Sequence, residues 1–266
     1  MNRVCAVLLL LVAAACSSQP AGAPQKISNA ANPRVTIAPD QALGWIGIAP
    51  LRARDASNWI PAGAQAVLVP MPADALTAGT TLSAIDTSGS VTRVTAGAPT
   101  KVPYGCDNNQ LDVLAFNGGK SAPGPVWLLP PSAPASWSPR SLVIVSPVAA
   151  TEERRRDTVG PLTLEIERTD GTHGALKIVR DGRALHTVAI SRAEVEGADA
   201  SPFDLRHPGV AIPEPVAAWS FADGGPILLV LLVPSYEGLH LKPLLVEDAG
   251  ARELPAMATY LYRCAF

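Results

Sequence analysis

Charged side chains are scarce in this chain, and they form no extended stripe of one sign. Only 17% of the 266 residues are Asp, Glu, Lys or Arg, and the formal net charge is −2. Binding to a nucleic-acid backbone needs clustered Lys and Arg, which displace condensed counterions. The composition therefore argues against a nucleic-acid partner.

Long apolar runs are also lacking. Beyond residue 16 the longest is Ile227–Val233, which is enclosed by Pro226 and Pro234. A membrane-spanning helix needs about 20 apolar residues. A run this short is typical of a strand buried on both faces, and we predict such a strand here.

Short catalytic and metal-binding motifs are missing as well. The four histidines form no HxH, HxxxH or HExxH pattern, and the sequence contains no CxxC, GxSxG, SxxK or phosphate-binding glycine loop. We therefore assign no catalytic residue, no metal ligand and no cofactor. Two alternatives depend on residues that only folding could bring together. They are a triad of Ser235, His240 and Asp248, and calcium sites at Asp107–Asn109 with Asp112 or at Glu194, Glu196, Asp199 and Asp204.

The start of the chain carries a targeting pattern. A basic residue, Arg3, precedes a short apolar run, Cys5–Val12, and small residues then lead to Cys16. This layout resembles the signal peptide and lipobox of bacterial lipoprotein precursors, in which the cysteine is acylated and becomes the new N-terminus. The resemblance covers residues 1–16, and Ala13 stands where the lipobox usually has Leu. It implies a signal peptide over 1–15 and lipidation of Cys16. Cleavage by the general signal peptidase after Ala15 is the alternative.

Cysteine arithmetic supports the lipid anchor and predicts a disulfide. Cleavage after residue 15 leaves Cys16, Cys106 and Cys264. Three thiols in an oxidising compartment leave one unpaired, whereas acylation of Cys16 leaves an even pair. We therefore predict a disulfide between Cys106 and Cys264, with two free, buried cysteines as the alternative.

The segment after Cys16 has the composition of a linker. Ser17–Asp40 is rich in Ser, Gln, Pro, Ala, Gly and Asn, and it has few large apolar residues to offset ordering entropy. As a random coil it would span roughly 25–30 Å. We expect residues 16–41 to tether a folded domain of residues 42–266 to the membrane, with a possible subdivision near 152–157. In the enterobacteria-like sorting of lipoproteins, a residue other than Asp after the cysteine favours the outer membrane. With Ser17 in that position, the resemblance implies the periplasmic side of the outer membrane rather than the inner membrane.

The folded part reads as all-β. The 26 prolines and 21 glycines of the whole sequence interrupt the chain too often for long helices, and short apolar segments alternate with turn signals. The clearest element is a meander over Leu162–Ile190, in which Asp181-Gly182 is typical of a type I′ hairpin turn. A short helix is expected at Ser191–Glu196. Further strands are predicted at Gly44–Ile48, Ala66–Val69, Leu82–Asp86, Val91–Thr95, Leu111–Phe116, Val126–Leu129, Leu142–Ser146, Ala217–Phe221, Leu241–Val246 and Thr259–Cys264.

This pattern predicts a mostly antiparallel, β-sandwich-like or open-barrel domain, with two packed β subdomains as the alternative. Six prolines surround Val126–Leu129, which favours an edge strand there. The charged run Glu152–Asp157 has cancelling signs and is typical of an exposed loop.

For function, the anchor, the tether and the strand-rich pattern favour a lipid-anchored envelope lipoprotein. We expect a non-catalytic binding, scaffold or assembly-accessory role, with the membrane and an envelope protein as partners. The alternative is a periplasmic hydrolase or a carbohydrate-binding protein. A carbohydrate platform would use exposed aromatics among Trp45, Trp59, Trp127 and Trp137.

Overall fold

The computed structural model describes residues 43–49, 67–70, 76–103, 110–146, 150–191, 205, 212–235 and 238–262, all of which lie in the unit Val35–Phe266. Outside these residues lie the signal peptide, the linker, Cys16, Cys106, Cys264, residues 192–196 of the expected helix and the acidic groups at 107–109 and 194–204. Ser191, the first residue of that expected helix, instead ends a strand, β12 (Arg183–Ser191). Within these ranges, no helix is long and apolar enough to cross a lipid bilayer.

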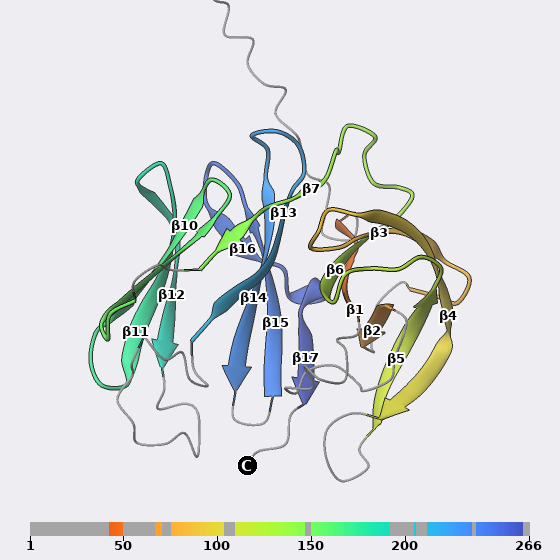
Figure 1. The fold of residues 1–266 in the computed structure, drawn as a ribbon, viewed down its shortest axis with the longest axis horizontal. Coiled ribbons are helices and arrows are strands. Elements are labelled where there is room, and N and C mark those ends of the chain that lie inside the picture. Colours follow the sequence, from red (N-terminus) through yellow and green to blue (C-terminus); the bar gives the residue numbers. More distant parts are fainter. Residues whose placement is uncertain are drawn as a thin grey trace, which may run out of the picture. The chain divides into compact units, whose positions relative to one another are not determined.

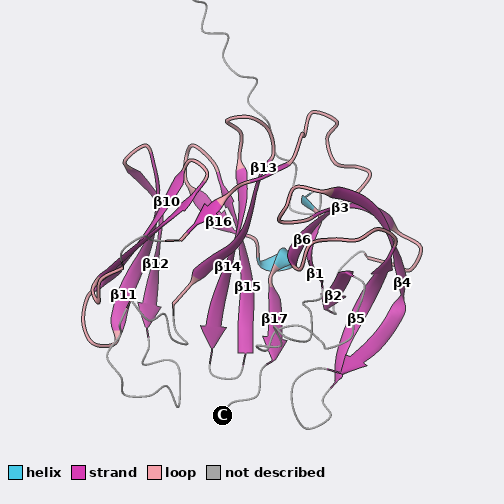
Figure 2. Cartoon of the chain, viewed as in Figure 1, coloured by secondary structure: helices cyan, strands magenta, loops and turns pink. Residues whose placement is uncertain are grey.

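The predicted all-β, antiparallel fold is confirmed (Figure 2). Besides the strands, the described part contains the 3₁₀ turn η3, Pro255–Met257. The strands are β1 Trp45–Ala49, β2 Val67–Pro70, β3 Thr81–Ile85, β4 Val91–Pro103, β5 Gln110–Asn117, β6 Gly124–Leu129, β7 Arg140–Ser141, β8 Ile144–Val145, β9 Arg154–Val159, β10 Leu162–Arg168, β11 His173–Arg180, β12 Arg183–Ser191, β13 Glu214–Ser220, β14 Ile227–Ser235, β15 Gly238–Val246, β16 Ala251–Glu253 and β17 Thr259–Tyr262.

Strands β1 to β6 form a closed barrel in the order β1-β2-β5-β4-β3-β6. Strand β6 pairs with β1 on one side and β3 on the other, so the expected edge strand at 126–129 is wrong. Val126 and Leu128 point into the barrel core, while Trp127 and Leu129 belong to a second core outside it. Burial of both faces explains why this proline-flanked segment is so apolar.

The predicted meander is also confirmed. Strands β9 to β12 pair in sequence, β8 extends the sheet at β9, and Leu162, Leu164 and Ile166 alternate with half-buried residues along β10. Asp181 and Gly182 both have positive φ, 50° and 76°, as the type I′ turn requires. This five-stranded sheet is called sheet C below.

The remaining strands form sheet B, in the order β16-β15-β14-β13-β7, with β17 also pairing with β15. On β14, Leu228 and Val230 face the core shared with the barrel, whereas Ile227 and Leu229 face the core shared with sheet C. The prediction of a strand buried on both faces is therefore confirmed. Sheet B lies between the barrel strands and sheet C, and with sheet C it forms a sandwich (Figure 1).

The charged run Glu152–Asp157 differs from its predicted loop. Strand β9 begins at Arg154, and the side chains of Arg155 and Asp157 are only 9% and 1% exposed. Alternate residues of β9 face the sandwich core, so the charged side chains of Arg155 and Asp157 are buried there. They are tolerated because Arg155 contacts both Asp157 and Glu214 of β13.

Candidate functional site

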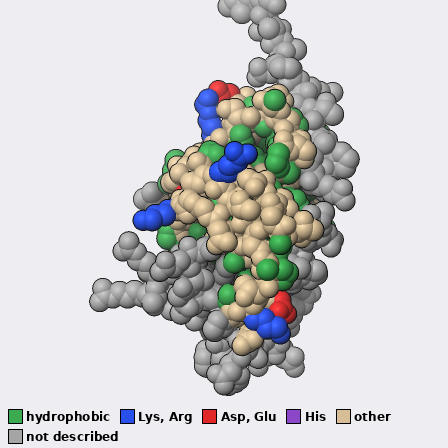
Figure 3. Space-filling model, turned by 90° about the vertical axis from the view of Figure 1, so that its right-hand side faces the viewer, with side chains coloured by type: hydrophobic (Ala, Val, Ile, Leu, Met, Phe, Trp, Pro, Cys, Tyr) green, Lys and Arg blue, Asp and Glu red, His purple; other side chains and the backbone are tan. Residues whose placement is uncertain are grey.

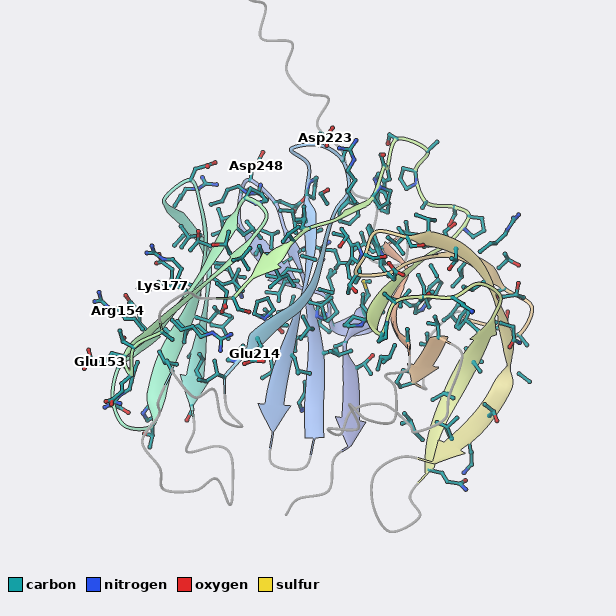
Figure 4. All side chains as sticks on the ribbon, in the orientation of Figure 1. Glu153, Arg154, Lys177, Glu214, Asp223 and Asp248 are labelled. Carbon is teal, nitrogen blue, oxygen red and sulfur yellow. The ribbon has the colours of Figure 1, made fainter. Side chains whose placement is uncertain are left out.

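A cavity of about 460 Å³ lies at one end of the two-sheet sandwich, within the size range of small-molecule sites. Loops of a β-sandwich gather at its ends, and here residues from four turns meet β7. The lining consists of Arg140, Ser141, Leu142, Pro161, Arg180, Asp181, Ser220, Ala222, Asp223, Gly224, Gly225, Ile227 and Asp248. Figure 4 shows Asp223 and Asp248 on neighbouring loops at the same end of the sandwich.

Among the four ion-paired side chains of this lining, that of Arg180 is the most buried, with 12% of its surface exposed. Arg180 ends β11, immediately before the Asp181-Gly182 turn. Its Nη1 donates a 2.7 Å hydrogen bond to Oδ1 of Asp248, which is 90% exposed. Its Nε and Nη2 have no hydrogen-bond partner within the structure as described, although guanidinium is a five-donor group. The site thus contains a fixed cation whose hydrogen-bonding capacity is only partly used.

A second ion pair stands at the same cavity. Nη1 of Arg140 on β7 donates a 2.7 Å hydrogen bond to Oδ1 of Asp223, in the turn between β13 and β14, and both side chains are exposed. The neighbouring Ser141 hydroxyl is engaged elsewhere, because it donates a 2.6 Å hydrogen bond to the carbonyl of Thr87. Gly224 has a φ of 67°, which lets the Asp223 turn close tightly.

The rest of the lining is largely apolar. Leu142, Pro161, Ala222 and Ile227 contribute hydrocarbon surface, and Ile227 belongs to the buried core of the sandwich. Guanidinium groups bind carboxylate and phosphate oxygens. The arrangement therefore suits the binding of a small molecule with an acidic group and an apolar part.

The cavity offers less for catalysis. The lining residues that the structure describes include no histidine or cysteine, and the two arginine-bound aspartates, Asp223 and Asp248, are already engaged. Among the residues open to description, no group of three or more His, Cys, Asp or Glu could hold a metal ion.

The triad of Ser235, His240 and Asp248 is not brought together. His240 lies near the start of β15 and Asp248 follows its end, so the strand alone separates them by about 20 Å. Burial, with a further contribution from the charge of Lys242, lowers the pKa of His240. The side chain of Ser235 lies outside the described part of the chain.

Asp112, a candidate calcium ligand in the sequence, and two glutamates of sheet C belong to surface networks. Asp112 pairs with Lys101 at 3.7 Å, while the remainder of its proposed calcium group lies outside the described residues. On sheet C, Glu165 accepts a 2.6 Å hydrogen bond from Arg156, and Glu167 accepts one of 2.8 Å from Lys177, which is the main cause of a lowered pKa at Glu167. Figure 4 labels Lys177 and Arg154 along this face.

Exposed tryptophans for a carbohydrate platform are not found at two of the four positions. Trp127 and Trp137 are buried, and they pack with Trp219 and Phe221 where the barrel meets sheet B. Trp45 is half-buried, and Trp59 lies outside the described residues.

Figure 3, which faces the barrel, shows its described Lys and Arg side chains as separate points rather than a patch.

Sequence reasoning missed Arg140 and Arg180 as site residues. Arg180 immediately precedes the Asp181-Gly182 turn, and Arg140 pairs with Asp223 in the Asp223-Gly224-Gly225 turn. Both turns contain recognisable turn signals. The missing information was spatial, because a turn signal does not tell which turns meet at one end of a sandwich.

Comparison of the chain with protein-family models, with curated proteins and with solved structures finds no match.

Proposed function

We propose that this protein is a lipid-anchored lipoprotein of the bacterial envelope whose β domain acts by binding. The binding role rests on the turn-end cavity, whose lining is largely apolar apart from its charged side chains. There, two donor nitrogens of the Arg180 guanidinium, Nε and Nη2, have no partner within the described structure. Such a site offers anchoring groups for a ligand or partner rather than a nucleophile paired with a base.

The proposal of a lipid anchor rests on the sequence. Arg3, the apolar run and Cys16 supply the lipobox-like pattern, and Ser17–Asp40 would hold the β domain away from the membrane. The residue after the cysteine is Ser17 rather than Asp, which favours the outer membrane, on its periplasmic side.

A disulfide between Cys106 and Cys264 belongs to the same proposal. It would connect the segment between β4 and β5 to the end of the chain that follows β17. In the chain-entropy model, closing so long a loop contributes about 5 kcal/mol as an upper figure. Intact-mass measurement after alkylation in denaturant without reductant should show neither cysteine alkylated; two modified thiols would contradict the pairing.

The anchor is tested by Cys16→Ala in cells, with Cys5→Ala as the matched control. Cys5 lies inside the signal peptide that processing would remove, so its substitution should leave membrane association unchanged. We expect Cys16→Ala to move the protein out of the membrane fraction at high salt. If that variant remains with the membranes, the lipid anchor is refuted.

The binding role is tested by crosslinking the intact protein in its native envelope, followed by mass spectrometry of what co-purifies through a C-terminal tag. A reproducible envelope protein supports the scaffold or accessory role. An empty result with folded, membrane-bound bait contradicts that role and favours the small-molecule role of the cavity or the hydrolase alternative.

A further inference from the structure

We propose that the turn-end cavity binds an acidic group, a carboxylate or a phosphate, attached to a small apolar body, with Arg180 as its anchor and Asp248 as the resident carboxylate that the ligand displaces. This inference deepens the proposed binding function and rests on it. It names the chemistry of the ligand, whereas the anchor and the envelope partner are separate questions.

The hydrogen bonds of Arg180 are incomplete. Asp248 reaches it through one hydrogen bond, from Nη1, while Nη2 and Nε remain without a partner in the described structure and shielded from solvent. A buried donor without an acceptor is unfavourable. Because Nη2 is shielded while Asp248 is in place, a ligand must first displace Asp248. A free carboxylate or phosphate is not tied to the β15–β16 turn, so it can then accept from Nη1 and Nη2 together in the bidentate geometry that arginine favours.

The side chain of Asp248 is only weakly fixed beside Arg180. Its side chain is 90% exposed, and it lies in a short turn closed by backbone hydrogen bonds between Glu247 and Gly250. Water competes for so exposed a carboxylate, and this competition reduces the free energy that its ion pair with the largely buried Arg180 contributes. Displacing this aspartate therefore costs much less than displacing a buried partner would.

The other residues of the lining also suit an acidic ligand with an apolar body. The Arg140–Asp223 pair is likewise exposed, so a second cation is available to further acidic oxygens. Leu142, Pro161 and Ile227 supply apolar surface for the body of the ligand. A cation held by the cavity's aspartates is disfavoured, because two of them, Asp223 and Asp248, already contact arginines and the described residues contain no metal-binding cluster.

The test is isothermal titration calorimetry of the full-length protein in non-ionic detergent with hexanoate, hexyl phosphate and hexanol as probes. We expect an acidic probe to bind and hexanol, which has the same apolar body, to bind far more weakly. The tighter of the two acidic probes identifies the group that the site prefers. Equal binding of hexanol, or no binding of either acidic probe at millimolar concentration, overturns the proposal.

Three substitutions distinguish a loss of ligand binding from a loss of folding. Arg180→Gln should abolish binding, while Arg156→Gln, which alters an exposed arginine of sheet C outside the cavity, should leave it unchanged. Asp248→Asn should tighten binding by about two- to fivefold, because the resident competitor is weakened. A purely structural Arg180–Asp248 pair predicts no tightening, so unchanged or weaker binding in Asp248→Asn contradicts the proposal even if Arg180→Gln fails to fold.

Failure here and failure of the proposed function are distinguishable. If acidic probes do not bind but an envelope partner is crosslinked, the scaffold role stands and the ligand chemistry is wrong. If Cys16→Ala stays in the membrane fraction while hexanoate binds, the anchor is wrong and the cavity proposal is supported.

Discussion

The indole Nε1 of Trp219 donates a 3.1 Å hydrogen bond to the backbone carbonyl of Asp86. Trp219 lies on β13 of sheet B, and Asp86 immediately follows β3 of the barrel. Both residues are buried. The bond therefore couples two sheets that share no strand, together with the hydrogen bond from Ser141 to Thr87 and the apolar core between the sheets.

This coupling predicts a specific cost for Trp219→Phe. The substitution removes the indole donor and leaves the buried Asp86 carbonyl with the hydrogen bond from the backbone N–H of Gly89. Trp137→Phe is the matched control, since Trp137 packs in the same aromatic cluster but its Nε1 has no partner within the described ranges. We expect Trp219→Phe to lower the free energy of unfolding by about 1 kcal/mol more than Trp137→Phe. Urea denaturation measures both, and equal losses would show that the hydrogen bond contributes nothing.

The carboxylate of Asp86 predicts a dependence of stability on pH. Burial raises its pKa, but hydrogen bonds from the backbone of Ala122, the Ser88 hydroxyl and the backbones of Ser90 and Ser88 outweigh burial, so the pKa is lowered from 3.8. The folded protein therefore holds this proton less tightly than the unfolded chain. The resulting stabilisation is present above about pH 4 and is lost as pH falls through the folded-state pKa.

Asp86→Asn tests this dependence. Asparagine keeps one acceptor oxygen, but its amide nitrogen is a donor and cannot replace the second carboxylate oxygen. We therefore expect the free energy of unfolding to fall by about 2–3 kcal/mol at pH 7. The difference between wild type and variant should shrink as the pH is lowered below 4. A difference that stays constant from pH 7 to pH 2.5 would show that the ionised carboxylate is not the stabilising form.

Local patterns in the sequence predicted most of the strands and little of their long-range pairing. Alternation along Leu162–Ile166 and the Asp181-Gly182 turn depend on neighbouring residues, and both were predicted correctly. Pairing of β6 with β1 joins Trp127 to Ile46, far away in the chain. Nothing local encodes that contact, so a central barrel strand resembled an edge strand flanked by prolines.

The charged strand β9 shows the same limit. Arg155 and Asp157 look like surface residues because isolated charges are rarely buried. The residue that completes their network, Glu214, lies 59 positions beyond Arg155. Similarly, the cavity needs Arg180 and Asp248, 68 positions apart, to meet. Sequence reasoning locates such residues only after the sheets have been assembled.

The buried network of β9 predicts unequal costs for two neighbouring arginines. Arg155 contacts both oxygens of Asp157, at 3.0 and 3.2 Å, and its replacement leaves a carboxylate that is 1% exposed without its cation. Arg156, on the opposite face, is 70% exposed in its pair with Glu165. We expect Arg155→Met to cost about 3–5 kcal/mol and Arg156→Met less than about 1 kcal/mol. Comparable losses in urea denaturation would show that the core location of Arg155 is energetically unimportant.

The turn beside Arg180 supplies a prediction in which side-chain packing plays no part. A Cβ at Gly182 would meet no atom within 4 Å, but the φ of 76° is unfavourable for any L side chain. Gly171 has equally open space around it and no positive φ. We therefore expect Gly182→Ala to destabilise the protein by about 1 kcal/mol, whereas Gly171→Ala should be neutral or stabilising by up to about 1 kcal/mol. Thermal and urea unfolding of the two variants provide the comparison. If both respond alike, the positive φ of this turn does not limit stability. If Gly182→Ala also weakens hexanoate binding while Gly171→Ala does not, the type I′ turn is needed to hold Arg180 in the cavity wall.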